Sequence, residues 1–478
     1  MREILFHNTL TGKTEPFVPL HDGVVTIYTC GPTVYDFAHI GNFRTFVFQD
    51  VLRRFLRSQG YRVNQTMNLT DVDDRIIERA AAAHVSIRDY TDPYIQAFLQ
   101  DRVTLHLERP EHLPRATDHI KEMAKLIETL TAKGFTYESE GSIYFRIAKF
   151  PRYGQLSKID LGGIQAGARV DVDRYDKADA RDFALWKAPK PGEEFWTTPI
   201  GKGRPGWHIE CSAMAMLYLG ETIDIHSGGI DLAFPHHENE IAQSEAATGK
   251  MFARYWLHAE HLLVDHEKMS KSLGNFSTLR DLLKEGYKPS SLRFLLASVP
   301  YRTQLNFTLE GLQQAASSVE RLRTFADRLN RSPFPAGTNP AIAQAATNAV
   351  EKFEAALAND LNTAQALAAV FDLLREANIA MDRGEFRENE RAAVADAFKK
   401  FDAIFAVLTD DDAELVRALG IGAPQGPADA EIEALVAQRQ AARKRRDFKE
   451  ADRIRAELSD RGIILEDTSD GGIRWKRK

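Results

Sequence analysis

The segment His39–Asn42, with the sequence HIGN, has residue types that suit phosphate binding. Gly41 has no side chain, so a ligand can approach the backbone closely there. A helix starting at this point would direct unpaired N–H groups and the positive end of its dipole toward a phosphate. His39 can donate to a phosphoryl oxygen whose charge grows in a transition state. The motif is short, however, and a turn histidine standing alone is usually structural.

A second segment, Lys268–Ser272, has the sequence KMSKS. Lys268 and Lys271 lie three residues apart among hydroxyl groups, and a glycine follows. A mobile cationic loop of this kind can neutralise a triphosphate during attack at its α-phosphorus. A solvated basic loop without function is the alternative for this segment taken alone.

The two cysteines, Cys30 and Cys211, have polar neighbours that could complete a metal site with them. His236 and Glu240 are four residues apart, so on a helix they share one face. Two thiolates, an imidazole and a carboxylate are all zinc ligands. The cysteines are 181 residues apart, so their spacing does not define the site.

Alternatives remain for each member of this set. His237 could replace His236, and Glu238 could replace Glu240. Two cysteines in a long chain without a signal-peptide pattern do not indicate a disulfide framework. A buried inert thiol is the common state of a free cysteine.

The elements that would position these residues are read from the apolar periodicity. Residues 24–29 predict a buried strand, helical spacing follows from Phe43 to Leu56 with Gly60 as a stop, and residues 61–69 predict a second strand. Strand, crossover helix and strand predict a parallel sheet. The pattern resumes as a helix over 209–219, a strand over 222–226 and a helix over 235–247.

The rest of the chain differs in texture. Residues 115–205 predict an insertion, and the sequence beyond 310 is almost wholly helical up to Leu419. A Gly/Pro-rich linker then leads to a small final domain. There, Asp447 to Glu450 resembles a capping box that opens a helix. The predicted buried stripe of that helix consists of Phe448, Ala451, Ile454 and Leu458.

The motifs in their order resemble one family. A HIGN turn followed far downstream by KMSKS resembles the class I aminoacyl-tRNA synthetases. Across essentially the whole chain, the similarity is to the cysteinyl-tRNA synthetase family, through CGPTVYDFAHIGN, MNLTDVDDRII, GWHIECSAM, IHSGGIDLAFPHHENEIAQSEA and KMSKSLGN. One position departs from the class I signature, whose fourth residue is usually His and is Asn42 in this chain. Asparagine can still donate a hydrogen bond but cannot be cationic.

The resemblance implies a domain organisation and an activity. It implies an α/β fold, with a Rossmann-like catalytic domain over 1–310, a helical anticodon-region bundle over 311–422 and a small mixed α/β anticodon-binding domain over 428–478. The implied reaction activates L-cysteine with ATP and Mg²⁺ to cysteinyl-adenylate, and then loads tRNA(Cys). His39, Asn42, Lys268 and Lys271 would be catalytic and, with Gly41, would bind ATP.

The resemblance also assigns the metal and the substrate pocket. One Zn²⁺ would be held by Cys30, Cys211, His236 and Glu240. Zinc prefers thiolate, and a cysteine thiol ionises at a pKa of ~8.5, so substrate sulfur can bind zinc where serine cannot. We therefore expect no editing domain.

Further residues are assigned by their place in the motifs. Cys30, Thr70, Trp207 and His226 are expected to bind cysteine, and Asp231 to meet the ribose or adenine side of ATP. Asp71, Asp73 and Asp74 are interpreted as an acidic helix start rather than as Mg²⁺ ligands. The candidate anticodon contacts are Arg443, Phe448, Asp452 and Asp467.

Composition bounds these expectations. The net charge is −6, which argues against a generic nucleic-acid coat, but residues 439–478 have 13 Lys or Arg against 8 Asp or Glu. No apolar run approaches a membrane span, so we expect a cytoplasmic protein with no membrane partner. We also expect a monomer. Two alternatives stay open: a cysteine ligase acting on an amino sugar, whose relatives lack the anticodon region, and a non-catalytic RNA-binding paralogue, which only Asn42 favours.

Overall fold

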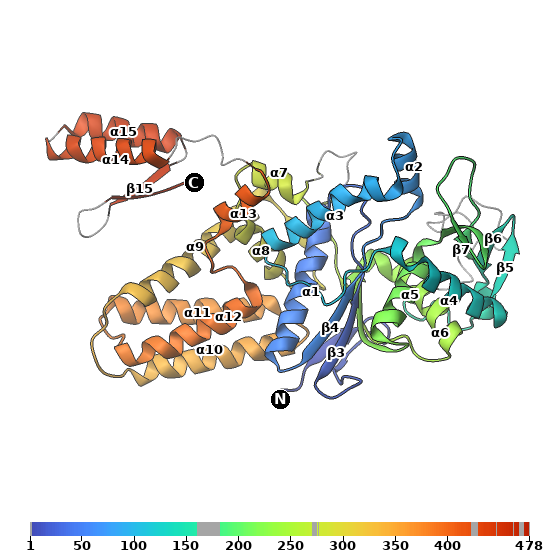
Figure 1. Cartoon of the computed structure of the whole chain (residues 1–478). Helices are drawn as coiled ribbons and strands as arrows, with labels where there is room; N and C mark the ends of the chain where they lie inside the picture. The colour runs from blue at the N-terminus through green and yellow to red at the C-terminus, as the bar shows by residue number, and fades with distance from the viewer. Residues whose placement is uncertain are drawn as a thin grey trace.

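The computed structural model describes residues 2–159, 182–269, 275, 277–421, 429–445, 447–461, 463–467 and 473–477. Figure 1 shows a parallel sheet with helices around it, a bundle of long helices beside it, and a small α/β unit near the C-terminus. The predicted fold class is therefore confirmed.

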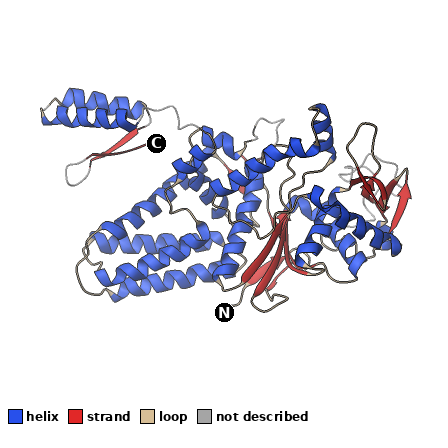
Figure 2. Ribbon diagram, in the orientation of Figure 1, coloured by secondary structure: helices blue, strands red, loops and turns tan. Residues whose placement is uncertain are grey.

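A four-stranded parallel sheet lies at the centre of the first region, with helices on both sides (Figure 2). Its strands run in the order β11-β10-β3-β4. They are β3 (Val24–Thr29), β4 (Arg62–Met67), β10 (Ile223–Gly229) and β11 (Ala253–Ala259). Because every pair is parallel, the carboxyl ends of all four strands meet at one edge. Ligands bind at this edge in open α/β sheets.

Helix α1 (Ile40–Ser58) crosses from β3 to β4, as the apolar spacing predicts. It starts at Ile40, three residues before Phe43, where the predicted apolar spacing begins, because His39 and Asn42 cap it reciprocally. Its apolar face is buried against the sheet and the neighbouring helices. After the last turn, Gly60 adopts a φ of +91°, which favours glycine.

Further elements surround this sheet. They are the hairpin β1 (Leu5–Asn8) and β2 (Lys13–Pro16), the small sheet β12 (Leu262–Val264), β13 (Glu267–Lys268) and β14 (Leu305–Phe307), and the helices α2 (Asp74–Ala82), α3 (Ile87–Thr104), α5 (Trp207–Leu219), α6 (Glu238–Thr248), α7 (Leu279–Lys284) and α8 (Pro289–Ser298). The predicted helix over 235–247 is divided, because the π-helical turn Ala233–His237 precedes α6.

The region predicted as an insertion forms a second, antiparallel sheet in the order β5-β6-β7-β9-β8. Its elements are α4 (Ile120–Ala132), β5 (Thr136–Ser139), β6 (Ser142–Phe145), β7 (Phe183–Lys187), β8 (Trp196–Thr198) and β9 (Gly201–Pro205). Phe145 and Trp186 belong to the same apolar core as Trp256 of the central sheet. The insertion is thus packed onto the central parallel sheet rather than tethered to it.

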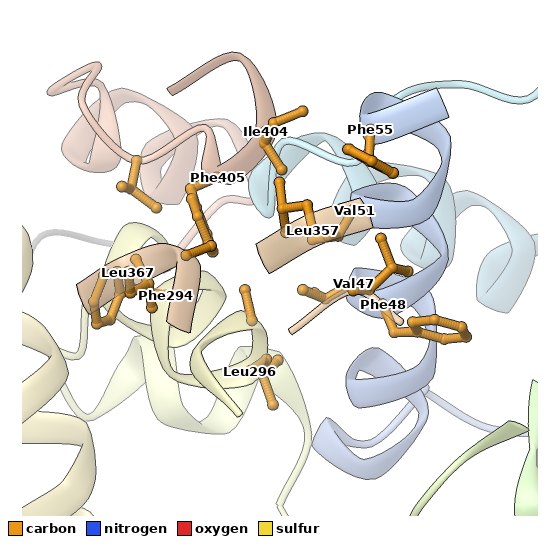
Figure 3. Close-up of a cluster of buried hydrophobic side chains, with 14 of the residues drawn as sticks. Val47, Phe48, Val51, Phe55, Phe294, Leu296, Leu357, Leu367, Ile404 and Phe405 are labelled. Carbon is orange, nitrogen blue, oxygen red and sulfur yellow. The ribbon is translucent and has the colours of Figure 1, made fainter. Parts of the chain in front are cut away.

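The helical bundle shares its core with the other face of the sheet region. Its helices are α9 (Leu309–Arg331), α10 (Pro340–Ala358), α11 (Thr363–Asp382), α12 (Arg391–Phe405) and α13 (Asp412–Ala418). Figure 3 shows Val51 and Phe55 of α1 facing Leu357 and Ile404 of the bundle. The apolar core therefore continues across residue 310.

The C-terminal unit has a core of its own. It consists of α14 (Asp429–Lys444), α15 (Phe448–Asp460), β15 (Ile463–Asp467) and β16 (Ile473–Arg477), and β15 and β16 are antiparallel. Ala451, Ile454 and Leu458 are buried, but Phe448 is 61% exposed, so the predicted stripe was wrong at its first position. At the helix start, Asp447 accepts from the Glu450 backbone N–H, whereas the Glu450 carboxylate pairs with Arg453.

Among the described residues, no helix is both long enough and apolar enough to span a membrane. A span needs roughly 20 apolar residues. The 23-residue helix α9 is long enough, but it buries only one face, as a helix of a water-exposed bundle does.

Candidate active site and metal centre

A cavity of about 390 Å³ opens at the carboxyl edge of the parallel sheet. The chain reaches it from the ends of β3, β10 and β11, from the start of α1 and from α5. Of the residues predicted for the site, its walls include Cys30, His39, Gly41, Asn42, Thr70, Trp207, Cys211, Asp231, His236 and Lys268. The topology thus brings together segments that are far apart in the sequence.

One end of the cavity is the start of α1. His39 Nδ1 accepts a hydrogen bond from the Asn42 backbone N–H at 3.2 Å, and Asn42 Oδ1 accepts from the His39 N–H at 3.1 Å. Since Nδ1 accepts, the imidazole proton lies on Nε2, which can donate to a ligand. A Cβ on Gly41 would come 3.0 Å from the His39 ring, so glycine leaves this histidine room.

Asn42 therefore has a role in this chain that does not need a positive charge. Its side chain accepts from the backbone N–H of His39, which caps the N-terminus of α1 and fixes the His39 backbone. The departure from the family pattern leaves the position of His39 intact.

The lysine-rich loop approaches the same end of the cavity. Lys268 is the last residue of the short strand β13, and its side chain is exposed. It lines the cavity together with Met269. Residues 270–274, with the predicted ATP ligand Lys271, lie outside the described residues.

The other end of the cavity holds a buried cluster of metal-binding groups. The ligand atoms of Cys30, Cys211, His236 and Glu240 all lie within 4.8 Å of one another. His236 Nε2 is 3.1 Å from Glu240 Oε1, and Cys30 Sγ is 3.9 Å from the same oxygen. A tetrahedral zinc site needs four such donors around one point, and this donor set fits it.

A second set, Cys30, His226, His237 and Glu240, satisfies the same distance. Three members of the first set line the cavity, whereas only Cys30 of the second set does. A metal held by the first set could therefore meet a substrate, so the geometry favours His236 over His237.

Glu238 is unsuited as a ligand because its carboxylate is already used. It accepts from the backbone N–H groups of Gly154, Leu156 and Ser157 and from the Ser157 hydroxyl, at 2.8–3.0 Å. This carboxylate fixes the insertion onto α6.

The electrostatics of the cluster suit a cation. Burial opposes ionisation of Glu240, but His226 and His236 lower the pKa of its carboxyl to about 2. Burial also opposes ionisation of Cys211, yet hydrogen bonding with Cys30 and the nearby His236 lower its pKa to about 6. Burial raises the pKa of the Cys30 thiol well above its usual range, and the anionic form of Cys211 beside it adds to the rise. A divalent cation would relieve this crowding of anionic donors.

The predicted cysteine pocket is only partly placed as expected. The Trp207 ring stacks on His236 with centroids 4.3 Å apart, and Thr70 lines the cavity. His226 does not line the cavity, and its contact with cysteine stays a prediction. Its Nε2 lies 2.8 Å from Glu240 Oε2, and its ring stacks on Trp256 at the back of the cluster.

Sequence analysis missed residues that orient the site. Asn68 donates to Thr70 Oγ1 at 2.9 Å and accepts from the Gly31 N–H at 2.9 Å, which ties the ends of β3 and β4 together. A Cβ on Gly31 would come 1.8 Å from the Asn68 carbonyl oxygen. His208 Nδ1 lies 2.9 Å from His236 Nδ1 and directs the other ring nitrogen to the cluster. In the sequence, only the positions of Asn68 and His208 close to Thr70 and Trp207 in the motifs indicated that these two residues belong to the site.

The acidic segment before α2 is structural, as interpreted. Asp73 caps α2 by accepting from the Ile76 N–H at 2.7 Å. Asp74 pairs with Lys187 and Arg204, and Asp71 accepts from the backbone N–H and hydroxyl of Thr117. Each carboxylate thus has a protein partner.

The candidate anticodon residues lie in the C-terminal unit. Arg443 near the end of α14 and Phe448 at the start of α15 flank one turn, and both are exposed. Asp452 is exposed and, at four residues from Phe448, shares its helix face. Asp467 ends β15; its side chain is outside the described part of the structure.

Three family models match successive parts of the chain. Residues 16–317 match the class I (C) tRNA synthetase catalytic domain, residues 352–409 a DALR domain, and residues 426–475 a cysteinyl-tRNA ligase anticodon-binding domain. The third match favours the main prediction over the amino-sugar ligase, whose relatives lack this region.

Similar proteins cover the chain from end to end. Cysteine–tRNA ligases of Koribacter versatilis and Solibacter usitatus are 57% and 58% identical, covering 98% and 99% of this chain and 99% of their own. That of Leptospira interrogans is 46% identical over the whole of both chains.

Among solved structures, Mycobacterium tuberculosis methionyl-tRNA synthetase shares the fold, with a TM-score of 0.57 at 15% identity, over 83% of this chain and 94% of that one. The resemblance carried by the motifs is thereby confirmed along the full sequence. The chain belongs to the cysteine–tRNA ligases, a family of class I aminoacyl-tRNA synthetases.

Proposed function

We propose that this chain activates L-cysteine with ATP, releasing pyrophosphate, and then transfers the cysteinyl group to the 3′ end of tRNA(Cys). One observation carries the proposal: a buried Cys₂HisGlu cluster and the capped start of α1 lie at two ends of one cavity. A thiol-selecting group and a phosphate-binding group therefore face the same substrate space.

At the first end, Cys30, Cys211, His236 and Glu240 would hold one zinc ion. When bound there, zinc would supply a soft Lewis acid that prefers the substrate thiolate to a serine hydroxyl. The chain's own residues shape the rest of this pocket. Trp207 covers His236, and Asn68 orients Thr70 toward the cavity.

At the second end, the residues act on ATP. The cysteine carboxylate attacks the α-phosphorus, and the bond from that phosphorus to the pyrophosphate oxygen breaks. His39 Nε2–H donates to an oxygen of the transferring phosphoryl group, where the dipole of α1 also favours negative charge. Lys268 and Lys271 would neutralise the departing pyrophosphate, where Mg²⁺ bound with ATP would supply further positive charge, and Asp231 would meet the ribose or adenine side.

The second step uses the same cavity. A ribose hydroxyl of the terminal tRNA nucleotide attacks the carbonyl carbon of the adenylate, and AMP leaves. Arg443, Phe448, Asp452 and Asp467 contact the anticodon, where unpaired bases offer faces for stacking and edges for polar contacts. We further propose that the enzyme acts as a monomer in the cytoplasm.

Cysteine-dependent ATP–pyrophosphate exchange, measured without tRNA and with zinc determined on the same sample, tests the first step. We expect exchange with cysteine and not with serine. Cys211→Ser should abolish zinc binding, and it should weaken the binding of cysteine far more than the binding of ATP. Ala215→Ser, which places the same hydroxyl one turn further along α5 in a buried position, is the matched control. Equal losses for ATP and cysteine, with zinc retained, would refute the metal assignment.

Charging of tRNA(Cys) tests the second step. Asp467→Ala should weaken charging while exchange proceeds as in the parent enzyme. If exchange falls equally, the anticodon assignment is wrong. A folded, zinc-containing protein with no exchange at all would point to a non-catalytic RNA-binding paralogue.

A further inference from the structure

One part of the cavity mouth is used by neither the metal cluster nor the ATP-binding end. Tyr35 and Phe37, between β3 and α1, line the cavity, and so does Arg75 of α2. Arg79 lies one helical turn beyond Arg75. We call Tyr35, Phe37, Arg75 and Arg79 the rim.

The two arginines of the rim are arranged on one aromatic ring. The guanidinium carbons of Arg75 and Arg79 lie 4.1 and 5.0 Å from the centroid of the Tyr35 ring. The backbone carbonyl of Tyr35 accepts from Arg79 Nη1 at 2.9 Å and from the Tyr90 hydroxyl at 3.0 Å, so the backbone that carries the ring is held in place. The arginine side chains are 57% and 44% exposed, and each pairs with one carboxylate: Arg75 with Asp73 at 3.1 Å and Arg79 with Asp36 at 3.7 Å. Exposed ion pairs contribute little stability, so a phosphate can compete with these carboxylates for the guanidinium groups.

Phe37 adds an exposed aromatic surface to the same mouth. It is 40% exposed, although large apolar side chains are normally covered. Its ring makes an edge contact with Tyr94, with centroids 5.4 Å apart, and the Arg280 guanidinium carbon lies 5.5 Å from its centroid, so the ring is held in place. An aromatic ring that is held and exposed beside guanidinium groups suits a nucleobase, because a base stacks on the ring while arginines contact phosphates.

We infer that the rim binds the unpaired 3′ end of tRNA, with Arg75 and Arg79 on its phosphates and Phe37 stacked on a base. This inference rests on the proposed function, since the acceptor nucleotide has to enter the cavity that holds the adenylate. The exposure of the guanidinium groups supports this occupant. The chain as a whole is acidic, with a net charge of −6, whereas the two arginines of the rim lie exposed beside the cavity, each with one paired carboxylate.

Two RNAs separate the affinity that comes from the 3′ end of tRNA from the affinity that comes from the rest of the molecule. The full-length R75A/R79A variant is compared with the parent enzyme on two RNAs: intact tRNA(Cys), and tRNA(Cys) lacking its unpaired 3′ nucleotides. We expect the variant to bind intact tRNA about tenfold more weakly and the shortened tRNA nearly as well as the parent does. The slope of log affinity against log salt should fall by about 0.7 for each phosphate that the variant no longer neutralises. R75K/R79K should restore that slope.

Arg57→Ala is the matched control. Arg57 is 51% exposed and paired with one carboxylate, Glu108, but it lies at the opposite end of α1 from His39. It should change neither tRNA affinity nor exchange. A second variant, Phe37→Leu, keeps an apolar side chain against Tyr94 and removes the aromatic face. It should lower charging relative to exchange by about fivefold or more.

Two results would overturn the inference. Equal losses on intact and shortened tRNA would place the contacts of the arginines elsewhere on the RNA. A matching rise in the KM for ATP during exchange would assign the arginines to the ATP phosphates. Absence of cysteine-dependent exchange in the parent enzyme would instead refute the proposed function, and the two-RNA comparison would still test the rim.

Discussion

The helical bundle and the C-terminal unit both follow the catalytic region in sequence, but they are joined to it in different ways. The bundle shares one apolar core with α1, where Val51 and Phe55 face Leu357 and Ile404 (Figure 3). The C-terminal unit packs around its own small core, which includes Leu458, and in Figure 1 it lies beyond the bundle.

The junction with the bundle is also fastened by buried charge. Arg293 of α8 is fully buried and pairs with Asp50 of α1 at 2.6 Å. It also donates to the carbonyls of Ile404 and Phe405 at the end of α12, so one guanidinium joins three helices. In the C-terminal unit, the comparable Arg453 pairs with Glu450 and Glu457 on the surface of its own helix.

This difference teaches which parts of the chain should behave as one unit. Disturbing the bundle should disturb adenylate chemistry, because α1 carries the phosphate-binding start. Disturbing the C-terminal unit should affect only the step that needs tRNA.

The largest effect is expected from Arg293→Ala. Removing Arg293 leaves the buried Asp50 with Arg54 as its cationic partner and leaves the carbonyls of Ile404 and Phe405 without this donor; breaking a buried ion pair costs about 3–5 kcal/mol. Urea denaturation of the parent and the variant measures this loss. Arg453→Ala, the surface counterpart, should leave the transition nearly unchanged. If both variants lost the same free energy of unfolding, the bundle junction and the C-terminal unit would not differ in the way proposed.

Leu357→Ala tests the apolar part of the junction. Leu357 is completely buried, and truncation of such a leucine costs about 2–5 kcal/mol. The temperature at which ATP–pyrophosphate exchange is lost should fall with the stability. Leu458→Ala makes the same change in an equally buried position of the C-terminal core. It should reduce tRNA charging and spare exchange; a loss of exchange would show that the C-terminal unit is not independent.

Acid should loosen the junction through Asp50. Burial opposes ionisation of its carboxyl, but Arg293 and Arg54 outweigh burial and lower its pKa. A lowered pKa means that the stabilisation is fully present above the unfolded-state pKa of about 3.9 and is lost as pH falls through the folded value. The free energy of unfolding should therefore decline below about pH 4. In Asp50→Asn its slope against pH should be smaller by up to about one proton; an unchanged slope would exclude Asp50.

The smallest effect on stability is expected from Phe448→Ala, because this side chain is exposed. Unfolding should shift by less than about 0.5 kcal/mol, and exchange should match the parent enzyme. The KM for tRNA in charging should rise by about fivefold or more if a base stacks on this ring. Phe448→Tyr, which keeps an aromatic face, serves as the control. A KM that is equal in the alanine variant and the parent would remove Phe448 from the anticodon site.

Much of the local structure was predictable because it depends on near neighbours. The strand over 24–29, the crossover helix and the parallel strand after it follow from apolar spacing alone. The first residue of α1 is set by the cap between His39 and Asn42, which is also a local contact because these residues are three apart. The motifs also identified the family, since their order along the chain does not depend on the fold being known.

The tertiary structure decided what depends on distant contacts. It placed Cys30 beside Cys211, showed that Glu238 is occupied by the insertion, and put His226 behind the cluster rather than on the cavity wall. It also revealed that the bundle shares a core with α1, whereas Phe448 is left in solvent. Periodicity tells which side chains share a face of an element. Only the packing of elements decides what that face meets, because the contact energy comes from residues far away in the chain.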